Sequence, residues 1–206
     1  MGASYGDLDN DGCLDFYLGT GNFEPWYFTP NLMYAGRRAG TSCTGTAENI
    51  SMLQGFGNVQ KGHGIVFFDV DEDGDQDIYS VLGGGWPGDK WVDQLFVNES
   101  RLDGRAWIKL RLRGRRTNYY GVGARITVRA VDQAGAPIVR RYLMDTGTGF
   151  GSKPFLAHIG LYTAARVERV EVYWPVSRQT RVYHPEILRT TVLDESEGEV
   201  VTSAAR

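Results

Sequence analysis

Several familiar signals are missing from this sequence. It has only two cysteines in 206 residues, so it is not a disulfide-dense scaffold, and without a Cys-x-x-Cys pair it has no zinc or redox motif. No apolar stretch approaches the ~18 residues of a membrane-spanning helix, and no signal peptide is recognisable. A convincing amphipathic helix is also missing, and residues 164–169 are expected to form at most a turn.

Signals of catalysis are equally scarce. The chain has three histidines, and a turn or core role is the simpler explanation for each. Ser152 lacks the Gly-x-Ser-x-Gly frame of a nucleophile elbow. The glycine-rich segments at 121–123 and 147–151 have neither a Walker lysine nor a Rossmann βαβ context. No catalytic constellation is visible, so an enzyme is not expected.

Glycine and short strand-like runs dominate what is present. Twenty-seven glycines separate short runs of β-branched and aromatic residues, which predicts an all-β protein. Residues 1–100 carry 15 acidic and 4 basic residues, a net charge of −11; residues 101–206 carry 10 and 18, a net charge of +8. This asymmetry predicts a domain boundary near residue 100, between a domain over residues 1–100 and a second over 105–195. Residues 196–206 are expected to form a flexible tail.

Two acidic segments share the pattern D-x-D-x-D-G-x-x-D, at residues 7–15 (loop 1) and 69–77 (loop 2). Alternate carboxylates of a tight loop converge on one centre, and the glycine allows the sharp turn. Without a bound cation the carboxylates of such a loop would repel one another, so each loop predicts a calcium site. Magnesium retains its waters and is less suited to an all-protein cage, and the simplest alternative is a pair of Asp/Gly turns without metal.

The predicted ligands occupy equivalent positions in the two loops. Side chains are expected at the first, third, fifth and ninth positions and a backbone carbonyl at the seventh, which gives Asp7, Asp9, Asp11, Cys13 and Asp15 in loop 1 and Asp69, Asp71, Asp73, Asp75 and Asp77 in loop 2. Asn10 and Glu72 lie between ligands and are expected to point outward.

The loops are not EF-hands. The twelfth position, a bidentate glutamate in an EF-hand, is Leu18 in one loop and Ser80 in the other, so the ninth-position aspartate must close each site. Apolar runs at 16–18, 65–68 and 78–82 indicate strands around the loops rather than helices.

The two loops belong to a longer repeat. They begin 62 residues apart, and Asn31-Leu-Met-Tyr34 and Gln94-Leu-Phe-Val-Asn98 follow them at a similar distance. In these segments the chain resembles the FG-GAP or VCBS-type repeats. The resemblance implies blades of a β-propeller with calcium between strands. About two blades are present where a propeller needs at least ~4, so we expect the remaining blades to be missing from this chain.

The second half carries a separate resemblance. Trp107-Ile-Lys-Leu110, Gly121-Val-Gly-Ala-Arg125, His158-Ile-Gly-Leu161 and Val170-Glu-Val-Tyr-Trp-Pro175 occur in that order. They resemble the ASPIC/UnbV domain that follows FG-GAP repeats in bacterial secreted proteins and in cartilage acidic protein. The resemblance implies an extracytoplasmic protein, secreted, periplasmic or on the cell surface.

Alternating apolar residues predict the fold of the second half. Ile108, Leu110 and Leu112 face one side of a strand, and Val170, Val172 and Trp174 form another such stripe. A hairpin turn is expected at 135–137. The predicted fold is an all-β chain, a partial propeller followed by a small antiparallel β-sandwich-like domain.

A basic row is expected on the outer face of the first of these strands: Lys109, Arg111, Arg113, Arg115 and Arg116. The simplest explanation of this row is a solvated strand face, and a second explanation is that the arginines dock onto the acidic half of the chain. The functional alternative is a site for a polyanion. Nucleic-acid binding is not expected, since no stacking platform or reading helix is visible.

Two questions stay open. Cys13 and Cys43 could form a bridge, although two partly buried free thiols are the favoured interpretation. The favoured function is a calcium-stabilised binding or adhesion module for an unknown protein or glycan ligand. The alternatives are an accessory or enzyme of a secondary-metabolite pathway, with a cleft around Ser152, His158 and Trp174, and an architectural piece of an envelope protein.

Overall fold

The computed structural model describes residues 2–24, 26–100, 104–147 and 150–201. Over these residues the chain is all-β, with several sheets and no helix, as predicted. No helix in the described part could therefore cross a membrane. The chain divides into a first unit (Met1–Asp9, Cys13–Arg101 and Gly147–Lys153) and a second unit (Asn10–Gly12, Leu102–Thr146 and Pro154–Arg206), and each is described by itself.

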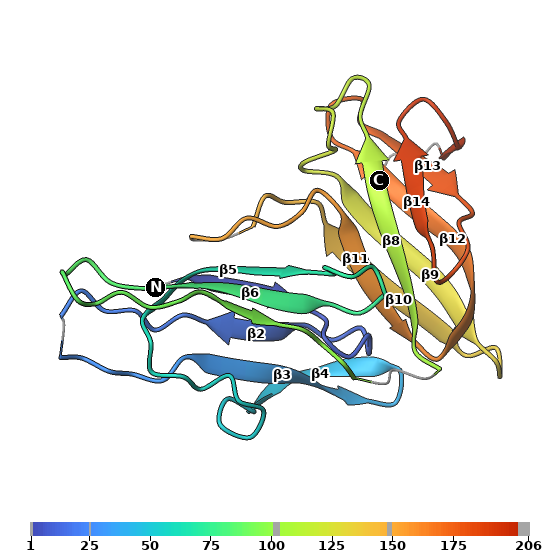
Figure 1. Ribbon diagram of the computed structural model, residues 1–206. Coiled ribbons are helices and arrows are strands. Elements are labelled where there is room, and N and C mark those ends of the chain that lie inside the picture. The colour runs from blue at the N-terminus through green and yellow to red at the C-terminus, as the bar shows by residue number, and fades with distance from the viewer. Residues whose placement is uncertain (1, 25, 101–103, 148–149, 202–206) are drawn as a thin grey trace. The chain divides into compact units, whose positions relative to one another are not determined.

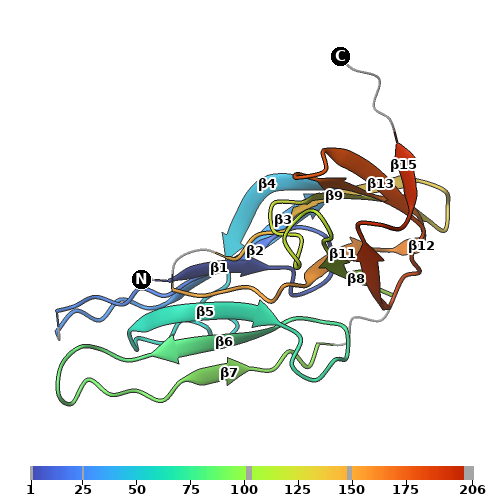
Figure 2. The same cartoon turned by 90° about the horizontal axis from the view of Figure 1, so that it is seen from above.

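The first unit consists of two antiparallel sheets (Figures 1 and 2). One has the order β1-β2-β3-β4 and the other the order β5-β6-β7. Their strands are β1 Ala3–Gly6, β2 Asp15–Leu18, β3 Leu32–Ala39, β4 Ser42–Asn49, β5 Gly62–Phe68, β6 Asp77–Leu82 and β7 Gln94–Phe96.

The strand framework repeats around the two acidic loops. Loop 1 joins β1 to β2 and loop 2 joins β5 to β6, which confirms the strands predicted at both sites. In each hairpin the residue before the loop pairs with the ninth loop position: Gly6 with Asp15, and Phe68 with Asp77. The ninth-position aspartate is therefore the first residue of the returning strand in both repeats.

A small apolar core lies between the two sheets of the first unit. Its buried members are Tyr17, Met33, Ile65, Phe67 and Ile78. Burial of such large side chains contributes roughly 1.5–3 kcal/mol each. The Tyr17 hydroxyl donates to the Phe56 carbonyl at 3.0 Å, so its polar end is satisfied inside this core.

Two glycines bring a distant segment against β5. A Cβ at Gly64 would lie 2.6 Å from the carbonyl oxygen of Phe150, and a Cβ at Gly151 would collide with the backbone of Ile65. Residues Gly147–Lys153 accordingly group with the first unit, although they lie in the second half of the sequence. Close backbone approach explains the glycine-rich run that has no phosphate-binding context.

The second unit is a two-sheet sandwich of eight strands (Figure 1). Its sheets have the orders β10-β9-β12-β13-β15 and β11-β8-β14. The strands are β8 Ala106–Arg113, β9 Arg125–Asp132, β10 Pro137–Leu143, β11 Ala157–Tyr162, β12 Ala164–Trp174, β13 Gln179–Tyr183, β14 Thr190–Asp194 and β15 Glu199–Val201.

The core of this sandwich draws on both sheets, as the alternating stripes predict. Leu110 and Leu112 of β8 pack in one cluster with Val170 and Trp174 of β12, all at most 2% exposed. The expected hairpin at 135–137 joins β9 to β10. One pairing departs from the expected antiparallel arrangement, because β14 runs parallel to β8.

Three other details differ from the sequence expectations. Residues 164–169 begin the long strand β12 rather than a turn, and register shifts in its pairing with β9 explain why their alternation is irregular. Lys109 is only 4% exposed, with its ammonium 4.6 Å from the centre of the Trp107 ring. Residues 199–201 of the expected tail form β15, which pairs with β13; residues 202–206 lie outside the described residues.

Candidate metal centres

The two acidic loops follow the same backbone path. The fourth position has a left-handed φ in both, 53° at Asn10 and 62° at Glu72. The sixth position is a glycine with φ of 83° at Gly12 and 105° at Gly74. A non-glycine residue rarely adopts this conformation, so its occurrence at the same position of both loops marks one conserved turn geometry within the chain.

Each loop brings three carboxylates into one small group. One oxygen atom each from Asp7, Asp9 and Asp15 lie within 4.8 Å of one another, and the same holds for Asp69, Asp71 and Asp77. These are the first, third and ninth positions of the predicted ligand set. Ionised carboxylates at this separation repel one another, and a divalent cation between them would reverse the sign of the interaction.

The ninth-position aspartates also close the loops mechanically. Asp15 accepts the backbone N–H of Leu8 at 2.8 Å and that of Gly36 at 2.8 Å, one on each carboxylate oxygen. Asp77 accepts those of Val70 at 2.7 Å and Asn98 at 2.8 Å in the same way. Each aspartate thus joins the start of its loop to the chain at or just beyond the third strand of its sheet.

The fifth-position aspartates lie outside the three-carboxylate groups. Asp73 accepts the backbone N–H of Asp75 at 3.1 Å, and Gly74 donates to Asp69 at 2.9 Å, so hydrogen bonds inside loop 2 set its turn. Asp11 is buried at 6% exposure. The structure therefore places three of the four predicted carboxylate ligands of each loop together.

The expectation that Asn10 points outward is corrected. Asn10 is 1% exposed, and its Oδ1 lies 2.9 Å from Nε2 of His158. Residues 10–12 group with the second unit, which explains how a residue between two ligand positions becomes buried. Glu72, its equivalent in loop 2, is exposed as expected.

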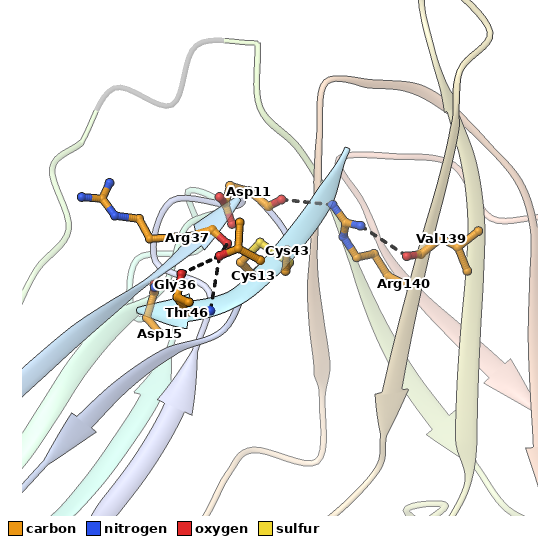
Figure 3. The surroundings of a disulfide bond; sticks show 10 residues. Asp11, Cys13, Asp15, Gly36, Arg37, Cys43, Thr46, Val139 and Arg140 are labelled. Atoms are coloured by element: carbon orange, nitrogen blue, oxygen red, sulfur yellow. Dashed lines mark hydrogen bonds between the residues drawn. A yellow bond between two sulfur atoms is a disulfide. The ribbon is translucent and has the colours of Figure 1, made fainter. Parts of the chain in front are cut away.

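The seventh position distinguishes the loops. Cys13 forms a disulfide with Cys43 of β4, with Cα atoms 5.5 Å apart (Figure 3), so the favoured interpretation of two free thiols is wrong. The sequence separation of 30 residues gave no hint of this pairing, because the β3–β4 hairpin is what returns Cys43 to the loop.

In loop 2 the seventh position is Asp75, a buried carboxyl. Its Oδ1 has no hydrogen-bond partner among the described residues, and the residue is 4% exposed. Burial, followed by the charges of Asp73, Asp77, Asp69 and Asp71, raises the pKa of Asp75 to about 7. The hydrogen-bond donors of loop 2 therefore do not compensate all of its carboxylate oxygens.

Two amide side chains that the sequence analysis did not single out connect the loops. Gln76 accepts the backbone N–H of Asp7 at 2.7 Å, and Asn98 donates to the carbonyl oxygens of Leu8 at 2.8 Å and Gln76 at 3.2 Å. Only their positions in the sequence could have indicated this role. Gln76 directly precedes the closing aspartate of loop 2, and Asn98 ends the recurring segment that contains β7.

A groove of about 570 Å³ opens beside loop 1. Asp9 and Asp15 line it together with Ile50, Phe56 and Phe96. Two residues of the three-carboxylate group of loop 1, the exposed Asp9 and the buried Asp15, therefore border an open groove.

The three residues of the enzyme alternative differ in burial and belong to two units. Trp174 is completely buried in the sandwich core, and His158 lies on β11 at 8% exposure. Ser152 groups with the first unit. Trp174 therefore cannot line a surface, whereas Ser152 is exposed.

The basic row is divided by burial and pairing. Lys109 is buried beside Trp107, whereas Arg115 makes a two-pronged contact with Asp194, with nitrogen–oxygen distances of 2.6–3.0 Å. The five side chains therefore do not present one continuous cationic face.

The fold and sites define an all-β protein in which two acidic loops in a repeated strand framework accompany a β-sandwich. Within it, the family described as ASPIC and UnbV matches residues 114–200. The chain thus contains an ASPIC/UnbV domain that spans β9 to β15, as its resemblance implied. A comparison with curated proteins gave no match.

Proposed function

We propose that the first unit is a calcium-binding module of the FG-GAP or VCBS type. Two calcium ions would hold its acidic loops, and the module would present the chain to a binding partner outside the cytoplasm. The observation that carries this proposal is the repeated convergence of three carboxylates per loop, each within 4.8 Å of the others, on the same backbone frame.

The residues present fit calcium. It takes six to eight hard oxygen ligands, and each loop offers three grouped carboxylates, a neighbouring aspartate at the fifth position and a backbone carbonyl at the seventh. The buried, unpartnered oxygen of Asp75 is the kind of atom that a nearby cation would stabilise. Calcium supplies charge compensation here.

A structural role for the metal follows from the position of the loops. Each loop is the turn between two adjacent strands, and its closing aspartate already holds the third strand through backbone N–H groups. A cation would therefore fix the hairpins and the link between the repeats. The groups around it include no base or nucleophile arranged for catalysis.

An extracytoplasmic setting has two supports. The Cys13–Cys43 disulfide suits an oxidising compartment, and loops of this kind suit the millimolar calcium found outside cells. The ASPIC/UnbV domain at residues 114–200 accompanies such repeats in the proteins that the chain resembles.

Calorimetric titration of the chelated protein with calcium tests the proposal. We expect two sites and a clear rise in melting temperature, because ligand binding to the folded state stabilises it in proportion to affinity. The variant Asp71→Asn removes one exposed, grouped carboxylate and should abolish the second site while leaving the first.

Glu186→Gln is the matched control, since Glu186 is an exposed acid outside both loops that pairs with Arg189 three residues further on. It should leave both sites intact. Two-site binding that survives Asp71→Asn unchanged would overturn the ligand assignment, and no binding to the wild-type chain would overturn the proposal itself.

A further inference from the structure

Exposed aromatic rings gather on the β2–β3 and β6–β7 connections of the first unit. In antiparallel hairpins these connections lie at the opposite strand ends from the acidic loops. The rings are exposed by 41–73% of their surface, and belong to Phe23, Trp26, Tyr27, Phe28, Trp86 and Trp91. Such a concentration of exposed aromatics marks an interaction surface.

Two of the three indole rings among them, those of Trp86 and Trp91, are held in place. Trp86 donates its Nε1–H to the Phe23 carbonyl at 2.9 Å, and the two rings pack with centroids 5.3 Å apart. Trp91 donates its Nε1–H to Asp89 at 2.9 Å. The polar edge of each indole is thus satisfied within the protein, which leaves its flat face for a ligand.

A buried lysine ties the two connections together. Lys61 is 2% exposed; its ammonium lies 2.7 Å from Asp89 in one connection and donates to the Glu24 carbonyl in the other at 3.0 Å. A buried ion pair with a further hydrogen bond tolerates little movement, because loss of either partner leaves a buried charge. The aromatic surface is therefore organised before any ligand arrives.

A pocket of about 450 Å³ opens at the Trp91 side of this surface. Its walls combine Trp91 with the side chains of His63, Asp89 and Lys90 and the backbone of Gly83 and Gly84. Gly84 is required there, since a Cβ would collide with the Asp89 carboxylate. The pocket thus pairs one aromatic wall with charged and polar groups.

We propose that this pocket binds a carbohydrate, with one pyranose ring over Trp91 and a further ring of the same oligosaccharide over the Trp86–Phe23 pair. A pyranose presents an apolar C–H face to an indole and hydroxyl groups around its rim. An acyl chain or an apolar helix would instead bury the charged side chain of Lys90 against groups that cannot hydrogen-bond, which is costly. This proposal rests on the proposed function, because it gives the binding module a class of ligand. It does not require calcium in the acidic loops.

Saturation-transfer NMR and tryptophan fluorescence titration of the whole chain test the site. The probes are hexaoses of β-linked glucose, β-linked mannose and β-linked N-acetylglucosamine, with their monosaccharides. We expect at least one hexaose to bind saturably and Trp91→Ala to weaken it about tenfold, the scale of one aromatic stacking contact. Trp86→Ala should weaken the hexaose and leave the monosaccharide unchanged.

The matched control is Tyr119→Ala, which removes an exposed aromatic ring from the second unit. Its sugar affinity should equal that of the wild type. Absence of binding by every probe, or equal binding by Trp91→Ala, would overturn the proposal. Binding to phosphatidylcholine vesicles without binding to any sugar would also overturn it and assign the rings to a membrane surface.

The same titrations in calcium and in chelator separate the two proposals. Sugar binding that persists in a chain without calcium sites would support the pocket while the metal assignment fails. Two calcium sites in a chain that binds none of the probes would leave the metal assignment standing and overturn the carbohydrate site.

Discussion

Asp75 in the first unit and Glu195 in the second are buried carboxylates with opposite surroundings. In the first unit burial, followed by the charges of four other aspartates, raises the pKa of Asp75 to about 7. In the second unit Glu195 is equally buried, but one of its oxygens accepts the backbone N–H groups of Arg115, Arg116 and Thr117 at 2.6–2.9 Å. The comparison shows that donors, rather than depth, decide whether a buried carboxylate is stable as an anion.

Burial alone would raise the pKa of Glu195, but its hydrogen bonds from the Arg115–Thr117 backbone lower it to about 2. Beside it, the Arg115 guanidinium holds the pKa of Asp194 well below its usual range. The second unit therefore supplies its own compensating charge and donors.

In the first unit Asp15 and Asp77 also accept backbone N–H groups, whereas Oδ1 of Asp75 has no hydrogen-bond partner among the described residues. That unit adds the Cys13–Cys43 cross-link and, under our proposal, metal ions.

The largest expected effect concerns the cross-link. The double variant Cys13→Ser, Cys43→Ser should lose about 4 kcal/mol of unfolding free energy, because the disulfide closes a segment of about 30 residues in the unfolded chain. Urea unfolding measures this loss, and calorimetry should show weaker calcium binding in loop 1 with loop 2 unchanged. Equal weakening of both loops would contradict the separate anchoring of loop 1.

The closing aspartates give the next effect. Asp77→Ala leaves the backbone N–H groups of Val70 and Asn98 without their acceptor, at an expected cost of about 3 kcal/mol in unfolding free energy. Asp15→Ala removes the equivalent bonds in loop 1 but should cost less, since the disulfide still holds that loop. Urea unfolding in chelator compares the two variants, and an equal loss would show that the disulfide does not support loop 1.

Glu195→Gln tests the second unit. The amide keeps the size of the side chain but removes the negative charge that accepts three backbone N–H groups and the Thr117 hydroxyl, so these hydrogen bonds are no longer charge-assisted. We expect a loss of about 2 kcal/mol in unfolding free energy, measured by urea unfolding, with calcium stoichiometry unchanged. Exposed Glu186→Gln serves as the control, and a loss of the same size there would show that the backbone donors contribute nothing specific.

Much of the fold could be predicted from the sequence because its signals are local. Alternation of apolar residues identified β8 and the end of β12, and acidic spacing identified both hairpin loops. The parallel pairing of β14 with β8 could not be predicted, since nothing local to either strand records its neighbour. The residues that begin β12 were missed because its register shifts interrupt the alternation.

The candidate metal centres were predictable in composition but not in surroundings. The spacing predicted four converging carboxylates in each loop, and the structure groups three of them, without the aspartate at the fifth position. It did not reveal that Cys13 reaches Cys43, that Asn10 is buried, or that Gln76 joins loop 2 to loop 1. Each of these depends on residues at least 30 positions away, and the loop sequence carries no information about them.

A smaller effect is expected from acid, which should lower the unfolding free energy through the Glu195 carboxylate of the second unit. The folded pKa of Glu195 is about 2 and lies below the ordinary glutamate value, so its stabilisation is present above pH ~4.5 and is lost as the pH falls toward 2. Wild-type stability in urea should therefore decline over that window more steeply than that of Glu195→Gln, by about 1–2 kcal/mol. Parallel declines in the two proteins would show that Glu195 does not stabilise the native state as an anion.

The smallest expected effect concerns Asp75, the buried carboxylate that was compared with Glu195. Asp75→Asn removes one charge from the four-aspartate surroundings of loop 2 and keeps the side-chain shape. In chelator we expect the variant to gain about 1 kcal/mol in unfolding free energy, because relief of repulsion outweighs an imperfect amide fit. In calcium the second site should persist, since the seventh position is expected to offer its backbone carbonyl. Urea unfolding measures the stability, and calorimetry measures the calcium sites. Loss of the second site would show that the Asp75 side chain is itself a calcium ligand. Loss of stability in chelator would show that loop 2 needs this carboxylate even without metal.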